Sequence, residues 1–123
     1  MNQAREYTAE ELRQLERETW SEKTFTAKVI ELARGYGWKV AHFRPARTAK
    51  GWRTAVQGDG AGFPDLVLVK KFVVFAELKT ATGKPSEEQM EWKRRLQVAG
   101  ELAYTWRPSD WPYICRILGE DVP

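Results

Sequence analysis

The stretch DLVLVKKFVVFAELK, residues Asp65–Lys79, contains two short apolar runs separated by two lysines. The runs, Asp65–Val69 and Phe72–Leu78, are rich in valine and phenylalanine, which favour β-strands. Their nearly continuous hydrophobicity is typical of strands that are covered on both faces. The Lys70–Lys71 step between them predicts a tight turn with an exposed tip. We therefore expect this hairpin to lie at the centre of a sheet.

The register of this hairpin brings three ionisable residues to one end of it. If the turn is centred on Lys71, Asp65 and Glu77 face each other to within one residue, and Lys79 points to the same side of the sheet as Glu77. Burying such charges unpaired would cost several kcal/mol per ion. A divalent cation would remove the repulsion between the two carboxylates, and Mg²⁺ prefers oxygen ligands of this kind. The alternative is a buried salt bridge of Lys79 with Glu77 or Asp65 that has only a structural role.

Capping signals place the helices around this hairpin. Serine or threonine residues with N-cap spacing precede four segments, at Thr8, Ser21, Ser86 and Ser109. The predicted helices cover residues 8–18, 21–35, 86–99 and 109–118, and further strands are predicted over 39–43 and 102–106. The helix between the hairpin and the last strand implies a right-handed crossover, which makes that strand parallel to Phe72–Lys79.

The predicted core has the order α-α-β-β-β-α-β, which is an α/β fold with a mixed sheet flanked by helices. Residues 44–63 are rich in glycine, threonine and alanine and show no hydrophobic period, so we expect a long functional loop there. We expect residues 1–123 to form one domain, with residues 1–20 as a helical extension of it.

The composition excludes several classes of protein. With 42% hydrophobic and 30% charged residues, the chain is typical of soluble globular proteins. No apolar run approaches the roughly 20 residues of a membrane-spanning helix. The polar start, Met1–Glu11, is unlike a signal or transit peptide, and the single cysteine, Cys115, cannot form an internal disulfide. We therefore expect a cytoplasmic protein without a membrane partner.

A basic segment indicates a polyanionic partner. The net charge is only +3, but no acidic residue occurs between Leu32 and Gly58. Aromatic residues are interleaved with the positive charges there, a combination that suits nucleic acid. The alternative is a solvated basic loop without a partner. The residues that we expect to contact nucleic acid are Arg44, Arg47, Lys50, Trp52, Arg53 and Arg107.

Two helical residues are candidates for the same site. Glu22 lies one turn before an expected buried stripe, and so points at the sheet, whereas Glu31 lies on the solvated side. Glu22 could instead only complement the helix dipole. Gln89 shares an inward helix face with Trp92, and its alternative role is the capping box with Ser86. The expected stripe of the first core helix comprises Phe25, Val29, Leu32 and Tyr36.

The order of these motifs resembles the VRR-NUC branch of the PD-(D/E)XK nuclease superfamily. The signature residues are Pro64-Asp65 followed by Glu77-Leu78-Lys79. The resemblance covers about Ser21 to Trp111 and further includes Ser21-Glu22, Gly37-Trp38, the stretch GFPDLVL at residues 62–68, Thr80, Ser86, Gln89, Trp92 and Trp106-Arg107-Pro108.

This resemblance implies a restriction-endonuclease-like fold and a DNA endonuclease that uses Mg²⁺ or Mn²⁺. It implies that Asp65, Glu77 and the backbone carbonyl of Leu78 hold the metal ion, with Glu22 acting directly or through water. Lys79 would position water or stabilise negative charge, and Gln89 would help to orient the site. Some members of the family act on branched DNA, which favours a structure-specific enzyme of replication, recombination or repair that cuts branched or four-way junction (Holliday junction) DNA.

Two other functions are consistent with the sequence. One is a nucleic-acid-binding protein that keeps the nuclease fold but does not cleave, and the other is a protein-interaction module with a basic loop. Concerted cutting of two strands needs two active sites, so we expect a homodimer. Its apolar patch could be formed by Trp106, Trp111 and Tyr113, unless these residues pack in the core.

Overall fold

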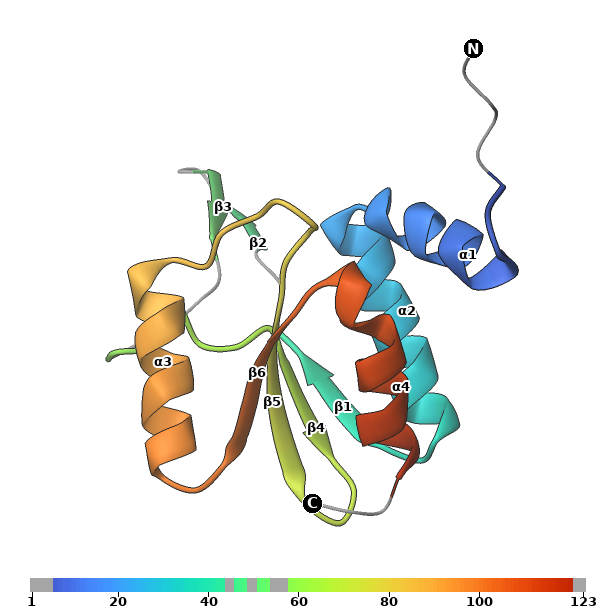
Figure 1. The fold of residues 1–123 in the computed structure, drawn as a ribbon. Coiled ribbons are helices and arrows are strands. Elements are labelled where there is room, and N and C mark those ends of the chain that lie inside the picture. The colour runs from blue at the N-terminus through green and yellow to red at the C-terminus, as the bar shows by residue number, and fades with distance from the viewer. Residues whose placement is uncertain (1–5, 44–45, 49–50, 54–57, 121–123) are drawn as a thin grey trace.

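A four-stranded mixed sheet forms the centre of the computed structural model, which describes residues 6–43, 46–48, 51–53 and 58–120 (Figure 1). Its strands lie in the spatial order β1 (Lys39–His42), β4 (Leu66–Val69), β5 (Val73–Leu78) and β6 (Leu102–Trp106). The pairs β1–β4 and β4–β5 are antiparallel, and β5–β6 is parallel. The predicted hairpin and the predicted parallel crossover strand are both confirmed.

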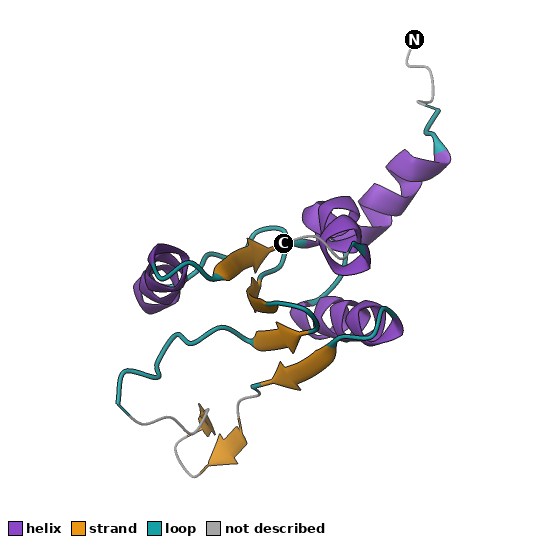
Figure 2. Cartoon of the chain, turned by 90° about the horizontal axis from the view of Figure 1, so that it is seen from below, coloured by secondary structure: helices purple, strands orange, loops and turns teal. Residues whose placement is uncertain are grey.

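Helices cover both faces of this sheet. One face is covered by α3 (Glu87–Val98), while α2 (Glu22–Gly35) and α4 (Trp111–Gly119) cover the other (Figures 1 and 2). The first helix, α1 (Ala9–Glu18), crosses near the start of α2. The fold is therefore the mixed α/β arrangement expected from the sequence. None of the helices in the described ranges is long and apolar enough to cross a membrane.

The predicted caps set where three of the helices begin. The side chains of Thr8, Ser21 and Ser86 accept hydrogen bonds from backbone N–H groups three residues further on. Each bond satisfies one of the donors that the first helical turn leaves without a partner. The fourth prediction is wrong: Ser109 lies inside a short 3₁₀ helix (Pro108–Asp110), and Asp110 is the N-cap of α4. The sequence pattern missed the 3₁₀ turn, which Pro108 begins with its fixed φ angle.

The main core lies between the sheet and the layer formed by α2 and α4. Alternate residues of β4 and β5 face this layer, because successive side chains in a strand point to opposite faces. On α2 the expected buried stripe is only partly right. Leu32 is half-buried, and Tyr36 is exposed because it lies beyond the end of the helix at Gly35. The buried residues of α2 are Phe25, Thr26, Val29 and Ala33, and those of β4 and β5 on this face are Leu66, Leu68, Val74, Ala76 and Leu78.

The opposite face of the sheet packs against α3 through aromatic residues. Phe63 makes edge-to-face contacts with Phe75 of β5 and with Trp92 of α3, at centroid distances of 6.1 and 5.1 Å. No residue of α3 is fully buried. The polar residues of α3 are therefore partly or fully exposed, whereas Glu77, the polar residue of β5, is buried.

The segment expected to be an irregular loop contains a two-stranded ribbon. Strands β2 (Ala46–Thr48) and β3 (Gly51–Arg53) pair with each other and form a sheet of their own (Figure 2). A strand sequence alternates between apolar and polar residues when one face of the strand is buried against a core. This ribbon stands apart from the core, so its sequence carries no such period and the prediction of a loop was wrong for these six residues.

Candidate active site

The hairpin register brings the carboxyl groups of Asp65 and Glu77 together. Leu66 pairs with Ala76, and the same register continued by one residue places Asp65 opposite Glu77. In an antiparallel pair, positions whose backbone groups face each other alternate with positions whose backbone groups point away. The Leu78 N–H points toward the neighbouring strand, where it bonds to Asp65, so Leu78 and the opposite residue Pro64 are at a facing position. Asp65 and Glu77 are therefore a non-hydrogen-bonded pair, the type in which facing side chains come closest.

Backbone contacts hold Asp65 in place on both sides. Its carbonyl accepts a hydrogen bond from the N–H of Phe43 at 2.9 Å, and its Oδ2 accepts one from the N–H of Leu78 at 2.9 Å. Pro64, opposite Leu78 in this register, has no N–H to donate. Pro64 therefore cannot supply the usual ladder hydrogen bond to the carbonyl of Leu78, the residue whose N–H is bonded to the Asp65 carboxylate.

Glu77 is buried, with only 4% of its surface exposed. One carboxylate oxygen, Oε1, accepts a hydrogen bond from Nε2 of Gln89 at 2.7 Å and lies 3.7 Å from Nζ of Lys79. The other oxygen, Oε2, is buried and receives no hydrogen bond from the described residues. A buried acceptor without a donor is costly, so this oxygen requires a proton or a cation.

The surroundings of Glu77 disfavour its charged form. Burial is the largest of the causes that raise the pKa of Glu77 from 4.5 to about 8, and the nearby carboxylates of Asp65 and Glu22 contribute to the same rise. The ammonium group of Lys79 acts in the opposite direction but does not offset them. Two close carboxylates, one with an oxygen that lacks a donor, together with the Leu78 carbonyl fit the oxygen ligands that a divalent cation prefers.

Gln89 links the start of α3 to this carboxylate. Its Oε1 accepts a hydrogen bond from the backbone N–H of Ser86 at 2.8 Å, which completes the capping box. The amide group is thereby turned so that Nε2 donates to Glu77 at 2.7 Å. One side chain thus forms the predicted capping box with Ser86 and also contacts Glu77.

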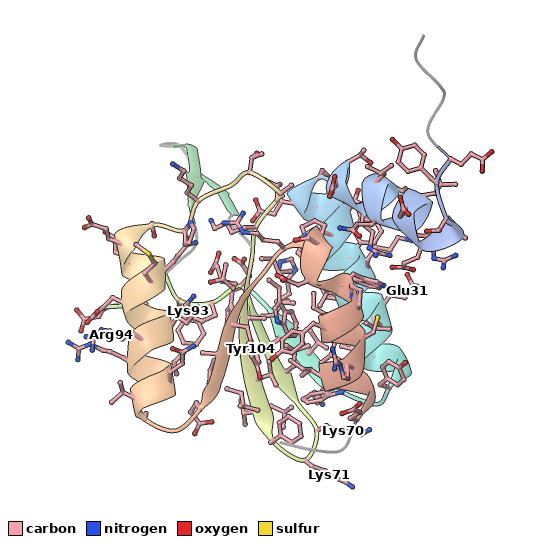
Figure 3. The ribbon with its side chains drawn as sticks, in the orientation of Figure 1. Glu31, Lys70, Lys71, Lys93, Arg94 and Tyr104 are labelled. Atoms are coloured by element: carbon pink, nitrogen blue, oxygen red, sulfur yellow. The ribbon has the colours of Figure 1, made fainter. Side chains whose placement is uncertain are left out.

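Glu22 approaches the site from the first turn of α2. It is exposed, and its charge is the smallest of the causes that raise the pKa of Glu77. Glu31 is exposed on the outer side of the same helix, where it lines a pocket with Tyr36 and Trp111 (Figure 3). Of the two glutamates, Glu22 is therefore the one that the structure brings to Asp65 and Glu77. Within the described ranges, no three His, Cys, Asp or Glu side chains converge closely enough to hold one ion.

Of the residues expected at a nucleic-acid interface, the structure describes only some, and for most of these it describes the backbone alone. The guanidinium group of Arg107 donates to the carbonyl of Thr80 at 2.7 Å, in the loop that follows Lys79. Arg44 and Lys50 lie outside the described residues. The backbones of Arg47, Trp52 and Arg53 belong to β2 and β3, and the structure does not describe their side chains.

Gly62 is a positioning residue that sequence reasoning missed. Its φ angle is +83°, and a Cβ atom there would lie 2.6 Å from the backbone carbon of Glu88. The indole N–H of Trp92 donates to the carbonyl of Asp59 at 3.0 Å and fastens the same segment to α3. The segment that delivers Asp65 is thus packed on the helix that delivers Gln89. The glycine before the Phe63-Pro64-Asp65 stretch was the available signal.

No protein-family model matches this chain, and no curated protein matches it. The larger of two described surface pockets, about 700 Å³, lies on α3 between Asp59 and Arg95 and does not include Asp65 or Glu77. The geometry around Asp65 and Glu77 is therefore the basis on which function can be inferred.

Proposed function

We propose that this protein is a divalent-metal-dependent endonuclease that hydrolyses phosphodiester bonds in DNA. The observation that carries this proposal is the buried Oε2 of Glu77, which has no hydrogen-bond donor in the described part of the chain and belongs to a carboxylate facing Asp65. A purely structural salt bridge between Glu77 and Lys79 would satisfy that oxygen with a donor. Here Lys79 instead lies 3.7 Å from Oε1, beyond a good hydrogen bond.

Asp65, Glu77 and the carbonyl of Leu78 would hold the cation, Mg²⁺ or Mn²⁺, with Glu22 contributing directly or through water. Such a cation would offset the negative charge of the phosphate group and lower the pKa of the water molecule bound to it. The ammonium group of Lys79 would position the attacking water molecule or stabilise the negative charge of the transition state. Gln89 keeps the Glu77 carboxylate oriented through its own bond to Ser86.

We further propose a restriction-endonuclease-like fold and membership of the VRR-NUC branch, on the order of the sequence motifs. Two residues of the motif before β4 have a physical role near the site. Pro64 frees the Leu78 carbonyl, and Gly62 allows the close approach to Glu88. We further propose that the basic segment from Arg44 to Arg53, together with Arg107, binds DNA, and that the substrate is branched or duplex DNA.

Alanine variants of the site test this proposal. Asp65→Ala, Glu77→Ala and Lys79→Ala should each abolish Mg²⁺-dependent cleavage of labelled duplex and four-way junction DNA while their circular dichroism stays unchanged. The matched control is Lys71→Ala, at the exposed tip of the same hairpin and far along the strands from Glu77 (Figure 3). Full activity in Glu77→Ala would overturn the proposed site. DNA binding without any cleavage by the wild-type protein would indicate a binding protein instead.

A further inference from the structure

Lys93 is a partly buried lysine beside the proposed site that the proposed chemistry does not use. It follows Gln89 by four residues, so both side chains lie on one face of α3. Gln89 contacts Glu77, and Nζ of Lys93 contacts Oγ1 of Thr105 at 3.2 Å. Figure 3 shows Lys93 on the side of α3 that faces the sheet and Arg94 on the opposite side.

Thr105 lies directly beside Glu77 in the sheet. The two residues are partners in the parallel pairing of β5 with β6, so their side chains point to the same face. Neighbouring strands are about 4.8 Å apart. Lys79, Glu77, Thr105 and Lys93 therefore form a polar row that crosses the α3-facing side of the sheet. The row ends at β6, which has no further strand beside it among the described residues (Figure 2).

Among the described residues, the ammonium group of Lys93 contacts only a neutral partner, the hydroxyl group of Thr105. Arg94 and Arg95 on the same helix pair with the Glu91 carboxylate at 2.8 and 2.7 Å, whereas the described residues give Lys93 no carboxylate within salt-bridge distance. A half-buried cation that is held by a hydroxyl group keeps its full charge available to an anion. Lys79 lies beside Glu77 on the same face, so Lys93 is the second cation of this row and lies at its β6 end.

We propose that Lys93 binds the phosphate that neighbours the scissile phosphate, so that the DNA strand leaves the site over the β6 edge, between α3 and α4. This inference rests on the proposed nuclease function and adds the path of the substrate to it. The hydroxyl group of Thr105 holds the Lys93 ammonium group in position for the DNA strand. The alternative is that Lys93 only fastens α3 to β6, in which case its charge has no effect on DNA.

The test compares cleavage by Lys93→Gln and Arg94→Gln, which remove the same charge from adjacent positions on opposite sides of α3. The probes are a fluorescently labelled four-way junction and a duplex of the same sequence, in Mg²⁺ at 50 to 200 mM KCl. For whichever probe the wild-type protein cuts, Lys93→Gln should raise KM about five- to tenfold at 0.1 M salt and leave kcat within about twofold. The slope of log KM against log salt should fall by about 0.7 to 0.9, the loss of one phosphate contact.

Arg94→Gln should leave both KM and the slope unchanged, and Lys93→Arg should restore most of the affinity. Urea unfolding of each variant monitors its stability, and Lys93→Arg keeps the test valid if Lys93→Gln unfolds. Equal KM values and equal slopes for Lys93→Gln and Arg94→Gln would overturn the inference while leaving the nuclease proposal in place. A wild-type protein that cuts neither these probes nor labelled single-stranded and flap DNA would overturn the proposed function, and this inference with it.

Discussion

The carboxyl group of Glu77 lies where a free negative charge is costly. It is buried, it faces a second carboxylate, and one of its oxygens has no donor among the described residues. Lys79 and Gln89 both approach the other oxygen. At neutral pH and without a cation, the raised pKa means that Glu77 is mostly protonated. Binding of a divalent cation would release this proton.

This protonation predicts how stability depends on pH. Burial, together with the nearby carboxylates of Asp65 and Glu22, raises the pKa of Glu77 from 4.5 in the unfolded chain to about 8 in the folded protein. Between these values the folded state keeps a proton that the unfolded state has lost, so the free energy of unfolding falls as pH rises, by up to about 1.4 kcal/mol per pH unit. The contribution is fully present below pH 4.5 and is lost above about pH 8. Urea unfolding between pH 5 and 8 in EDTA measures it.

Glu77→Gln is the control for this measurement, because glutamine fills the same space without titrating. The difference in the free energy of unfolding between the wild type and Glu77→Gln cancels the other titrating groups, and it should decrease steadily from pH 5 to pH 8. A difference that does not change with pH would mean that Glu77 has an ordinary pKa in the folded protein.

Pro64 gives a second prediction at the scale of a single residue. Pro64→Ala adds a backbone N–H opposite Leu78, and this N–H can donate to the Leu78 carbonyl. The carbonyl would then be a poorer metal ligand, and we expect Mg²⁺ affinity or cleavage to fall about 10- to 100-fold, as for other changes around metal ligands. Titration of Mg²⁺ in the cleavage assay measures the effect. Unchanged Mg²⁺ dependence in a folded Pro64→Ala protein would exclude the Leu78 carbonyl as a ligand.

Among the elements, the contact between the segment before β4 and the start of α3 sets the geometry of the site. Gly62→Ala would place a methyl group 2.6 Å from the backbone of Glu88, in addition to the cost of its positive φ angle. We expect Gly62→Ala to lower the stability by about 2 to 4 kcal/mol, the sum of strain and overpacking, and to lower activity by separating Asp65 from Gln89.

Gly58→Ala is the matched control for this change. Gly58 also has a positive φ angle, +60°, but a Cβ atom there meets none of the described residues within 4 Å. It should therefore show only the conformational cost of about 1 kcal/mol. Thermal or urea unfolding of both variants separates the two effects. Equal losses of stability in both variants would mean that the contact of Gly62 with α3 has no energetic importance.

The elements also show why some of the structure could be predicted and some could not. The register of Asp65 and Glu77 could be predicted, because a two-lysine turn between two apolar runs leaves little freedom to shift the pairing. Gln89 could be predicted because a capping box and a helix face are both local patterns. The β2–β3 ribbon could not be predicted, because it does not pack on the core and its sequence therefore shows no alternation of apolar and polar residues. The role of Pro64 depends on which backbone groups face each other across two strands, and the sequence alone does not contain that information.

For the molecule as a whole, the expected surface for a homodimer needs correction. Trp106 is only 1% exposed and stacks on Tyr104, so it belongs to the core rather than to an apolar patch. Trp111 packs edge-to-face on Trp20 at 5.4 Å, and only Tyr113 of the three is exposed. The expectation of a dimer therefore has no support from this end of the chain. It stays a prediction from the need for two active sites.

Light scattering at micromolar concentration tests that prediction. A homodimer should have a mass of about twice the 14.2 kDa of one chain. If the enzyme is a dimer, it should cut opposing strands of a four-way junction symmetrically. A mass near that of one chain, together with single nicks at unrelated positions, would show that one chain acts alone.

The central claim is that Asp65 and Glu77 bind a divalent cation with which the protein cuts DNA. The most direct measurement incubates the purified wild-type protein with labelled single-stranded, duplex, flap and four-way junction DNA in Mg²⁺, in Mn²⁺ and in EDTA, with Glu77→Ala in parallel. We predict cleavage of at least one of these substrates in Mg²⁺ or Mn²⁺, none in EDTA, and none by Glu77→Ala under any condition. No cleavage by the wild type in either metal, or equal cleavage by Glu77→Ala, would contradict it.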